Sequence, residues 1–427
     1  MTTGILILFG MMAFCFIIRM PVSFSMLVAG LSYFLFKGSR LGQIASVITS
    51  NMFGNYIMLA APLFLFTANV MNSGKVTEKV FDFANCFLGR FRGGTGHVNV
   101  FASLIFSGMT GSAIADAAGL GVMEIAQMKK EGYDDGFSCA ITAASATIGP
   151  IFPPSIPMVV YAMLSGASIG KLFMGGMVPG VLIAAVLMIY VAIVAKKRNY
   201  PKGPKFTPKE FIWKTVSAFP ALLTPVLLLG GIYGGVVTPT EAGAVAALYA
   251  LVISILVYRS LGLKDLITIF RNTATTTSAL ALIVGAAMLF SYIIALEKVP
   301  NTLALHVTGL TDNKYVFLFV INILFLVLGA AMDTSAIQLV FIPMIVPMLQ
   351  TFEIDLVHFG VLISLNMMIG LSTPPFGMLL FIVSGLGKTP LKAVIKELMP
   401  MVLLMIGILF LITYVPDIVM FLPNRYG

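Results

Sequence analysis

Runs of about 20 apolar residues recur along the whole chain, and they limit the possible folds more than any other feature. Typical runs are "ALLTPVLLLGGIYGGVV" (221–237), "AGAVAALYALVISILVY" (242–258) and "MVLLMIGILFLITYVP" (401–416). Each of them is long enough to cross a hydrocarbon core of about 30 Å as a helix. Long continuous runs favour a bundle of membrane helices over a membrane β-barrel, whose strands alternate apolar and polar residues.

The composition supports a chain that is embedded in a lipid bilayer. Hydrophobic residues make up 59% of the 427 residues and charged residues 10%, whereas soluble domains carry roughly 25% charged residues. The first 20 residues lack a basic start and a small-residue cleavage site, so we expect a first membrane span there and not a signal peptide.

The densest basic stretch, "KKRNYPKGPKFTPKEFIWK" (196–214), indicates the orientation of the chain. It is also rich in proline, and positively charged loops lie in the cytoplasm, so we expect a cytoplasmic linker over 196–216. Counting spans outward from it predicts about 10–11 membrane helices, with both termini outside the cytoplasm. Membrane topology then accounts for the net charge of +9, and no nucleic-acid partner is expected.

The second half of the chain repeats the first. "TIGPIFPPSIPM" (147–158) aligns with "MIGLSTPPFGML" (368–379), so that Gly149 and Gly370 pair at a spacing of 221 residues. The predicted units are a first repeat over 1–195 and a second over 217–427. Because the first starts outside and the second inside, the repeats are inverted, which is typical of secondary transporters.

Each repeat contains a predicted interrupted helix, at about 134–165 and about 356–387. Prolines 150, 153, 154 and 157 break the first, because proline lacks an N–H and clashes with the preceding turn. Irregular backbone at membrane depth must be buried in protein or line a polar cavity. The carbonyl end of one half-helix suits Na⁺, and the N–H end of the other suits an anion.

A re-entrant hairpin is predicted before each interrupted helix, at about 97–130 and about 315–350. Each has two apolar arms, marginal in length for a span, and a polar tip at 107–112 or 329–335. We expect the two tips to meet the interrupted helices near the middle of the bilayer.

Candidate site residues follow from the tips and the interruptions. The candidate cation ligands are Ser107, Gly108, Thr110, Ser112, Thr147, Gly149, Gly329, Asp333, Thr334, Ser335, Gly370, Ser372 and Thr373. The candidate substrate-binding residues are Pro153, Pro154, Ser155, Pro374 and Pro375. The second half-helix is expected to begin near Pro153 and Pro154 in the first repeat, and Thr373 is a candidate N-cap in the second.

Three carboxylates in apolar surroundings have two possible roles each. Asp333 is expected to act in cation binding, with capping of the second hairpin arm as the alternative, since an ionisable residue inside a membrane is costly. Asp116 and Glu124 on the return arm of the first hairpin are functional or structural, Asp116 as a helix cap. Thr238 and Glu241 form a predicted capping box, with Pro239 at the first helical position.

Several chemistries lack support. The three histidines have no ligand spacing, so no metal site beyond Na⁺ is expected. The sequence has no G-x-x-x-x-G-K-[ST], H-E-x-x-H or G-x-S-x-G motif, so neither direct use of ATP nor enzyme activity is expected.

Over nearly its whole length, the sequence resembles the large membrane subunit of tripartite ATP-independent periplasmic (TRAP) transporters, the DctM-like family. The resemblance rests on these stretches: "GMTGSAIADAAGLG", "IGPIFPPSIPM", "VVTPTEAGAVAALYAL", "MDTSAI" and "GLSTPPFG". It implies Na⁺-coupled import of a small organic anion across the bacterial inner membrane by an elevator mechanism, with Na⁺ as coupling ion and no cofactor. Family substrates include C4-dicarboxylates, sialic acid and other sugar acids.

The resemblance also implies two partner proteins. One is a small four-helix membrane subunit, expected as a separate polypeptide, and the other is a periplasmic solute-binding protein that delivers the substrate. The alternative is a stand-alone Na⁺/dicarboxylate carrier without a binding protein, and a more distant alternative is a channel.

Overall fold

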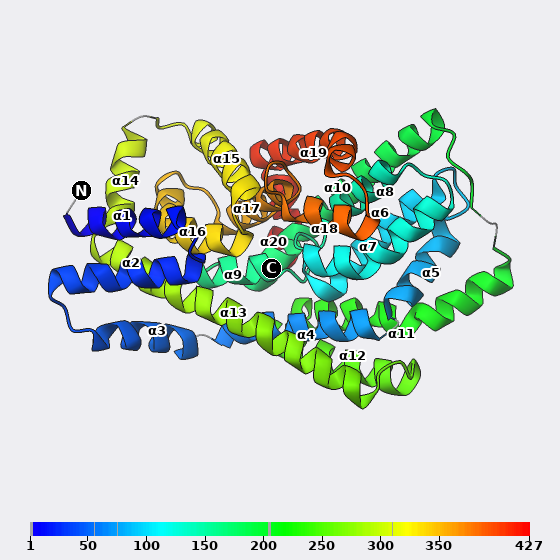
Figure 1. Cartoon of the computed structure of the whole chain (residues 1–427), viewed down its shortest axis with the longest axis horizontal. Coiled ribbons are helices and arrows are strands. Elements are labelled where there is room, and N and C mark those ends of the chain that lie inside the picture. The colour runs from blue at the N-terminus through cyan, green and yellow to red at the C-terminus, as the bar shows by residue number, and fades with distance from the viewer. Residues whose placement is uncertain (1–2, 55, 75, 204–205, 310) are drawn as a thin grey trace.

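The computed structural model describes residues 3–54, 56–74, 76–203, 206–309 and 311–427 (Figure 1). Over these residues the protein is helical, and β-type pairing is limited to one isolated antiparallel bridge between Arg92 and Lys202. The predicted all-α fold class is confirmed.

The helices are α1 (Thr3–Ile17), α2 (Val22–Lys37), α3 (Gly42–Gly54), the 3₁₀-helix η1 (Tyr56–Leu59), α4 (Ala60–Ser73), α5 (Val76–Leu88), α6 (Gly94–Thr110), α7 (Ala113–Lys130), α8 (Asp135–Ala146), α9 (Ile156–Ser165), α10 (Ile169–Lys197), α11 (Pro208–Tyr233), α12 (Pro239–Val252), the π-helix η2 (Ile253–Val257), α13 (Leu263–Leu296), α14 (Val299–Thr308), α15 (Lys314–Ala331), α16 (Thr334–Thr351), α17 (Leu356–Leu371), α18 (Met378–Gly387), α19 (Leu391–Tyr414) and α20 (Asp417–Tyr426).

Many of these helices are apolar enough for a membrane. In the described part of the chain, seven are long and apolar enough to cross one: α10, α11, α12 with η2, α13, α15, α16 and α19. Five shorter apolar helices accompany them: α1, α2, α9, α17 and α18. The protein is therefore a multi-pass membrane protein.

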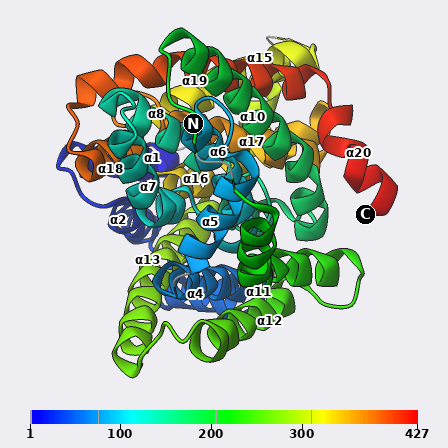
Figure 2. The same ribbon diagram turned by 90° about the vertical axis from the view of Figure 1, so that its right-hand side faces the viewer.

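The helices form two layers, which Figures 1 and 2 show from perpendicular directions. One layer contains α3, α4, α11, α12 and the long α13, and the other contains α6–α10 and α15–α20. The largest buried hydrophobic cluster lies mainly in the second layer, and a separate cluster joins α1 and α2 to α13. The division into 1–195, 196–216 and 217–427 stays a prediction.

Helix α6 ends at Thr110 and α7 begins at Ala113, so the chain reverses within two residues. Gly111 makes the turn with φ +62°, a conformation in which glycine has no steric penalty. The Ser112 side chain then accepts a hydrogen bond from the Ala115 N–H and caps α7. In the second half, α15 ends at Ala331 and α16 begins at Thr334 after the N-cap Asp333.

Two helix interruptions lie beside these turns, between α8 and α9 and between α17 and α18. The half-helix α9 begins at Ile156, two residues after Pro154 and three after Pro153, because the Ser155 side chain caps it by accepting from the Met158 N–H. Thr373 is not the N-cap of α18. That position is Gly377, and the Thr373 hydroxyl donates to the Ile369 carbonyl.

The helix start in "VTPTEAG" is confirmed. The Thr238 side chain accepts from the Glu241 N–H, and Glu241 Oε2 accepts from the Thr238 N–H at 2.8 Å. Pro239 is the first residue of α12, where its missing N–H removes no helical hydrogen bond.

Each turn is joined to its neighbouring interruption through the backbone. The Ile156 N–H donates to the Gly111 carbonyl at 3.3 Å, and the Phe376 N–H donates to the Ala330 carbonyl at 3.2 Å. In the second half, Gly329 and Gly370 pack backbone against backbone. Irregular backbone at both interruptions thus finds partners inside the protein.

Gly370→Ala should destabilise the protein. A Cβ at this position would lie 2.6 Å from the Gly329 carbonyl carbon, and backbone would have to move. We expect a loss of about 1–3 kcal/mol, seen as a lower midpoint of thermal unfolding in detergent. Gly385→Ala in α18 is the control, because nothing lies within 4 Å of its added Cβ. Equal effects of the two variants would contradict the close contact.

A charge cluster joins the end of α10 to α8 and α19. Arg198 donates to Asp134 Oδ2 at 2.7 Å and to the two Glu397 oxygens at 3.0 and 2.8 Å. The Tyr200 hydroxyl donates to the same Asp134 oxygen at 2.6 Å. These contacts hold the start of the basic segment 196–214 against both halves of the chain.

The cluster predicts a dependence of stability on pH. The hydrogen bond from Tyr200 and then that from Arg198 lower the pKa of Asp134. A carboxyl with a lowered pKa adds stability above its unfolded pKa of about 3.9 and loses it as pH falls through the folded value. Asp134→Asn should therefore be less stable near neutral pH, by under about 1 kcal/mol because the site is half exposed. The difference should disappear in acid, and a difference in the thermal midpoint that is constant with pH would contradict this assignment.

Candidate functional site

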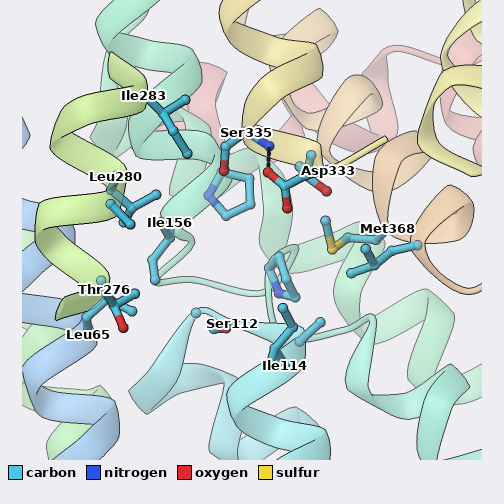
Figure 3. A pocket seen from close by; sticks show the side chains of 17 residues that line it. Leu65, Ser112, Ile114, Ile156, Thr276, Leu280, Ile283, Asp333, Ser335 and Met368 are labelled. Atoms are coloured by element: carbon cyan, nitrogen blue, oxygen red, sulfur yellow. Dashed lines mark hydrogen bonds between the residues drawn. The ribbon is translucent and has the colours of Figure 1, made fainter. Parts of the chain in front are cut away.

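A cavity of about 310 Å³ lies where the two turns, the interruptions and α13 meet (Figure 3). Its lining comes from distant parts of the chain: Leu65, Gly111, Ser112, Ala113, Ile114, Pro150, Ile156, Pro157, Thr276, Ala279, Leu280, Ile283, Asp333, Thr334, Ser335, Met368 and Leu371. Residues of both predicted tips therefore share one cavity, as the sequence predicts for a common site.

Three helices begin at this cavity. Helix α7 starts after Ser112, α9 after Ser155 and α16 after Asp333, and first-turn residues of all three line it. A helix N-terminus carries partial positive charge and unpaired N–H groups, so it favours an anion. The described lining contains no lysine or arginine. In the described part of the cavity, positive potential therefore comes from the backbone at these helix starts and not from a charged side chain.

Asp333 supplies negative charge at the same cavity. Its Oδ1 accepts a hydrogen bond from the Ser335 N–H at 2.9 Å, drawn as the dashed line in Figure 3. Asp333 has the capping role considered from the sequence, since it is the N-cap of α16, and it also lines the cavity, while its part in cation binding stays a prediction. Carboxylate oxygens together with the hydroxyls of Thr334 and Ser335 are the ligand type that a hard cation prefers.

Four of the candidate cation ligands line the cavity: Ser112, Asp333, Thr334 and Ser335. The other nine lie in the surrounding turns and helix ends: Ser107, Gly108, Thr110, Thr147, Gly149, Gly329, Gly370, Ser372 and Thr373. Several of these hydroxyls donate to carbonyls of their own helix. Examples are Ser107 to Ser103 at 2.6 Å and Thr147 to Ala144 at 2.6 Å.

The five candidate substrate residues lie outside the cavity lining. Pro153, Pro154 and Ser155 are buried in the first interruption, whereas Pro375 is exposed in the second. Pro150, Ile156 and Pro157, which flank the first group, line the cavity instead. Pro154 contacts the first turn, because its carbonyl oxygen would lie 2.5 Å from a Cβ at Gly111.

Sequence reasoning missed the wall formed by α13 and α4. Thr276, Ala279, Leu280 and Ile283 on α13 and Leu65 on α4 line the cavity (Figure 3). A signal was present in "TATTTS" (273–278), a run of hydroxyl residues inside a long apolar segment. The Thr276 hydroxyl donates to the Asn272 carbonyl at 3.0 Å. Polar side chains in such a segment are a general pointer to a polar cavity.

Asp116 and Glu124 lie outside this cavity. Both are on α7, almost completely buried, at 1% and 0% exposure. The alternative role of Asp116 as the cap of the return arm is wrong, because Ser112 holds the N-cap position.

Comparison with known proteins gives the same family along most of the chain. The profile of the family described as "Tripartite ATP-independent periplasmic transporter, DctM component" matches residues 9–418. The sialic acid TRAP transporter large permease protein SiaM of Vibrio cholerae is 41% identical over 407 residues, covering 95% of each chain. The C4-dicarboxylate TRAP transporter large permease protein DctM of Pseudomonas aeruginosa is 38% identical over 373 residues, covering 87% of each.

A solved structure supports the fold. The YdaH transporter of Alcanivorax borkumensis, described as having an unusual topology, superposes with a TM-score of 0.60. The match covers 88% of both chains at 16% sequence identity, which shows similarity of fold alone.

Thr276→Phe should obstruct the cavity, because the larger side chain enters the space between α13 and the α9 and α16 starts. We expect transport of the substrate to fall at least about tenfold, equivalent to about 1.4 kcal/mol of lost stabilisation. Thr275→Phe is the matched control, since Thr275 is exposed and outside the lining. Equal transport by the two variants in proteoliposomes would exclude this cavity from the pathway.

Proposed function

The chain belongs to the DctM component family of tripartite ATP-independent periplasmic transporters, and we propose that as its large permease subunit it couples import of a small organic anion to Na⁺. It is a multi-pass protein of the bacterial inner membrane. The relatives are permease subunits of transporters, which are not enzymes.

The proposal rests on one observation: the same cavity has features that favour an anion and a feature that favours a cation. The starts of α7, α9 and α16 favour a substrate carboxylate, and Asp333 favours a cation. An anion beside an ionised Asp333 is repelled unless a cation lies between them. Na⁺ bound near Asp333 would therefore raise the affinity for the anion, which is the thermodynamic basis of coupling.

The substrate belongs to the class of small carboxylates. The cavity volume of about 310 Å³ is at the lower end of ligand pockets in proteins, which suits a small acid. The relatives in Vibrio and Pseudomonas are named for sialic acid and C4-dicarboxylates. These two acids are the first substrates to test, followed by other sugar acids.

The transport motion we propose is an elevator. The cavity lies between α13 and α4 on one side and the turns and interruptions on the other. If α6–α9 and α15–α18 move together past α13 and α4, the cavity opens to alternate sides of the membrane. The family name describes a tripartite system, so we propose a small membrane subunit and a periplasmic solute-binding protein as partners.

Asp333→Ala should abolish Na⁺-dependent uptake into proteoliposomes while membrane insertion survives. It removes a carboxylate from the cavity and a helix cap worth about 0.5–2 kcal/mol. Asp265→Ala is the control for the capping effect, because Asp265 caps α13 by accepting from the Gly262 N–H at 2.8 Å and lies outside the cavity lining. Ser372→Ala is expected to behave like Asp333→Ala, and undiminished uptake by both would remove these residues from the site.

The same assay separates the alternatives. A tripartite transporter imports substrate only when the solute-binding protein is supplied, whereas a stand-alone carrier imports free substrate without it. A channel would conduct substrate without a Na⁺ gradient.

A further inference from the structure

Glu124 is a carboxyl group in the protein interior, away from the cavity. Glu124 Oε1 has no hydrogen-bond partner among the described residues, and neither oxygen of Asp116 on the same helix has one. Eight residues separate the two side chains, about 12 Å along α7. Buried polar atoms are nearly always paired, so each of these oxygens requires an explanation.

A buried polar network surrounds Glu124. The Asn99 Nδ2 donates to Glu124 Oε2 at 2.6 Å and to Thr142 Oγ1 at 2.8 Å. The Ser145 hydroxyl donates to Asn99 Oδ1 at 2.7 Å, and the Ser103 hydroxyl donates to Ser145 at 3.3 Å. All five side chains are at most 1% exposed. Asn99 thus donates one N–H to Glu124 and the other to Thr142, and its oxygen accepts from Ser145.

No positive group in the described structure compensates a charge on Glu124. The other carboxyl group buried on α7 is Asp116, which would add repulsion and no compensation. Three helices packed against α7 carry ionisable side chains: His97 on α6, Asp135 and Cys139 on α8, and Glu78, Lys79, Asp82 and Cys86 on α5. The described parts of α4 and α18, which also pack against α7, carry none. Lys129 on α7 itself pairs with Asp135 at 3.0 Å, and Lys130 next to it lies at the end of α7. An ionised Glu124 would be a buried charge without a partner, which costs several kcal/mol.

The second half of the chain builds a comparable network from neutral side chains. The Asn366 Nδ2 donates to Asn322 Oδ1 at 2.9 Å, and the Asn322 Nδ2 donates to Thr413 at 2.9 Å. Asn366 is the residue that pairs with Ser145 at the spacing of 221. On α16, the return arm after the second turn, Gln338 is fully buried. A neutral acid at Glu124 would make the first network neutral as well.

We propose that Glu124 is a proton-binding site, protonated and neutral while α6, α7 and α8 are packed together. A proton fits this place better than a metal ion, because the neighbouring Asn99 presents a donor and not its oxygen to the carboxyl group. When the proton dissociates to bulk water, a carboxylate remains beside Asn99 in the interior and destabilises the packed arrangement. The site therefore makes the transport unit sensitive to alkaline pH, separately from the cavity at Asp333.

Infrared difference spectroscopy on purified protein near neutral pH tests the protonation state directly. The wild-type spectrum minus that of Glu124→Gln should contain the carbonyl stretch of a neutral carboxylic acid. Glu131→Gln is the control at the C-cap of the same helix, because Glu131 is partly exposed and accepts from Thr95 and Gln127. Its difference spectrum should show ionised carboxylate bands. Carboxylate bands in the Glu124 difference spectrum would overturn the proposal. This result does not depend on which substrate the protein transports.

The predicted sensitivity to alkaline pH is tested by measuring stability and uptake as a function of pH. Of these two measurements, only uptake rests on the proposed transport function. As pH rises, the wild-type thermal midpoint should fall, whereas that of Glu124→Gln should change less, since its amide cannot ionise. Uptake by the variant near neutral pH should stay within about twofold of the wild type. Three results would each overturn the proposal: identical pH profiles, loss of uptake in the variant alone, or failure of the variant to fold. A neutral amide should be able to take the place of a neutral acid without these losses.

Discussion

The structure depends on the need to pair every backbone N–H and carbonyl in a medium without water. Two helices are interrupted in an otherwise apolar chain, and unpaired backbone groups there would each cost several kcal/mol in lipid. The protein meets this need by packing a chain reversal against each interruption. The hydrogen bonds Ile156 to Gly111 and Phe376 to Ala330 are the direct evidence. Glycines at the contacts let backbone approach backbone closely enough for such packing.

The cavity is a consequence of this arrangement. Helices that begin beside a reversal direct the positive ends of their dipoles toward the same space, and α7, α9 and α16 all begin at this cavity. Asp333 adds a carboxylate to a place that otherwise attracts anions, so the electrostatics of the site change with a bound cation. Ion dependence can thus arise from one cap residue and helix ends, without a lysine or arginine in the described lining.

Much of this arrangement could be predicted from sequence because its signals are local. Prolines 153 and 154 mark an interruption wherever they occur in an apolar run, and the matching pair at 374 and 375 indicates a repeat. Thr238 and Glu241 specify their capping box within four residues. The helix start at Ile156 was misplaced because proline at 153 or 154 and the hydroxyl of Ser155 are both plausible first-turn signals. The hydroxyl run at 273–278 marks a polar stretch of α13, but it does not indicate which segments face Thr276, and the network around Asn99 likewise depends on contacts between distant segments.

The central claim is that one cavity holds a cation and an organic anion together. Calorimetric titration of the purified protein with its substrate at several Na⁺ concentrations tests it most directly, because linkage requires each ligand to raise the affinity for the other by the same factor. We predict that substrate affinity rises with Na⁺, and that substrate raises Na⁺ affinity equally. Substrate binding that does not change with Na⁺ would contradict the account.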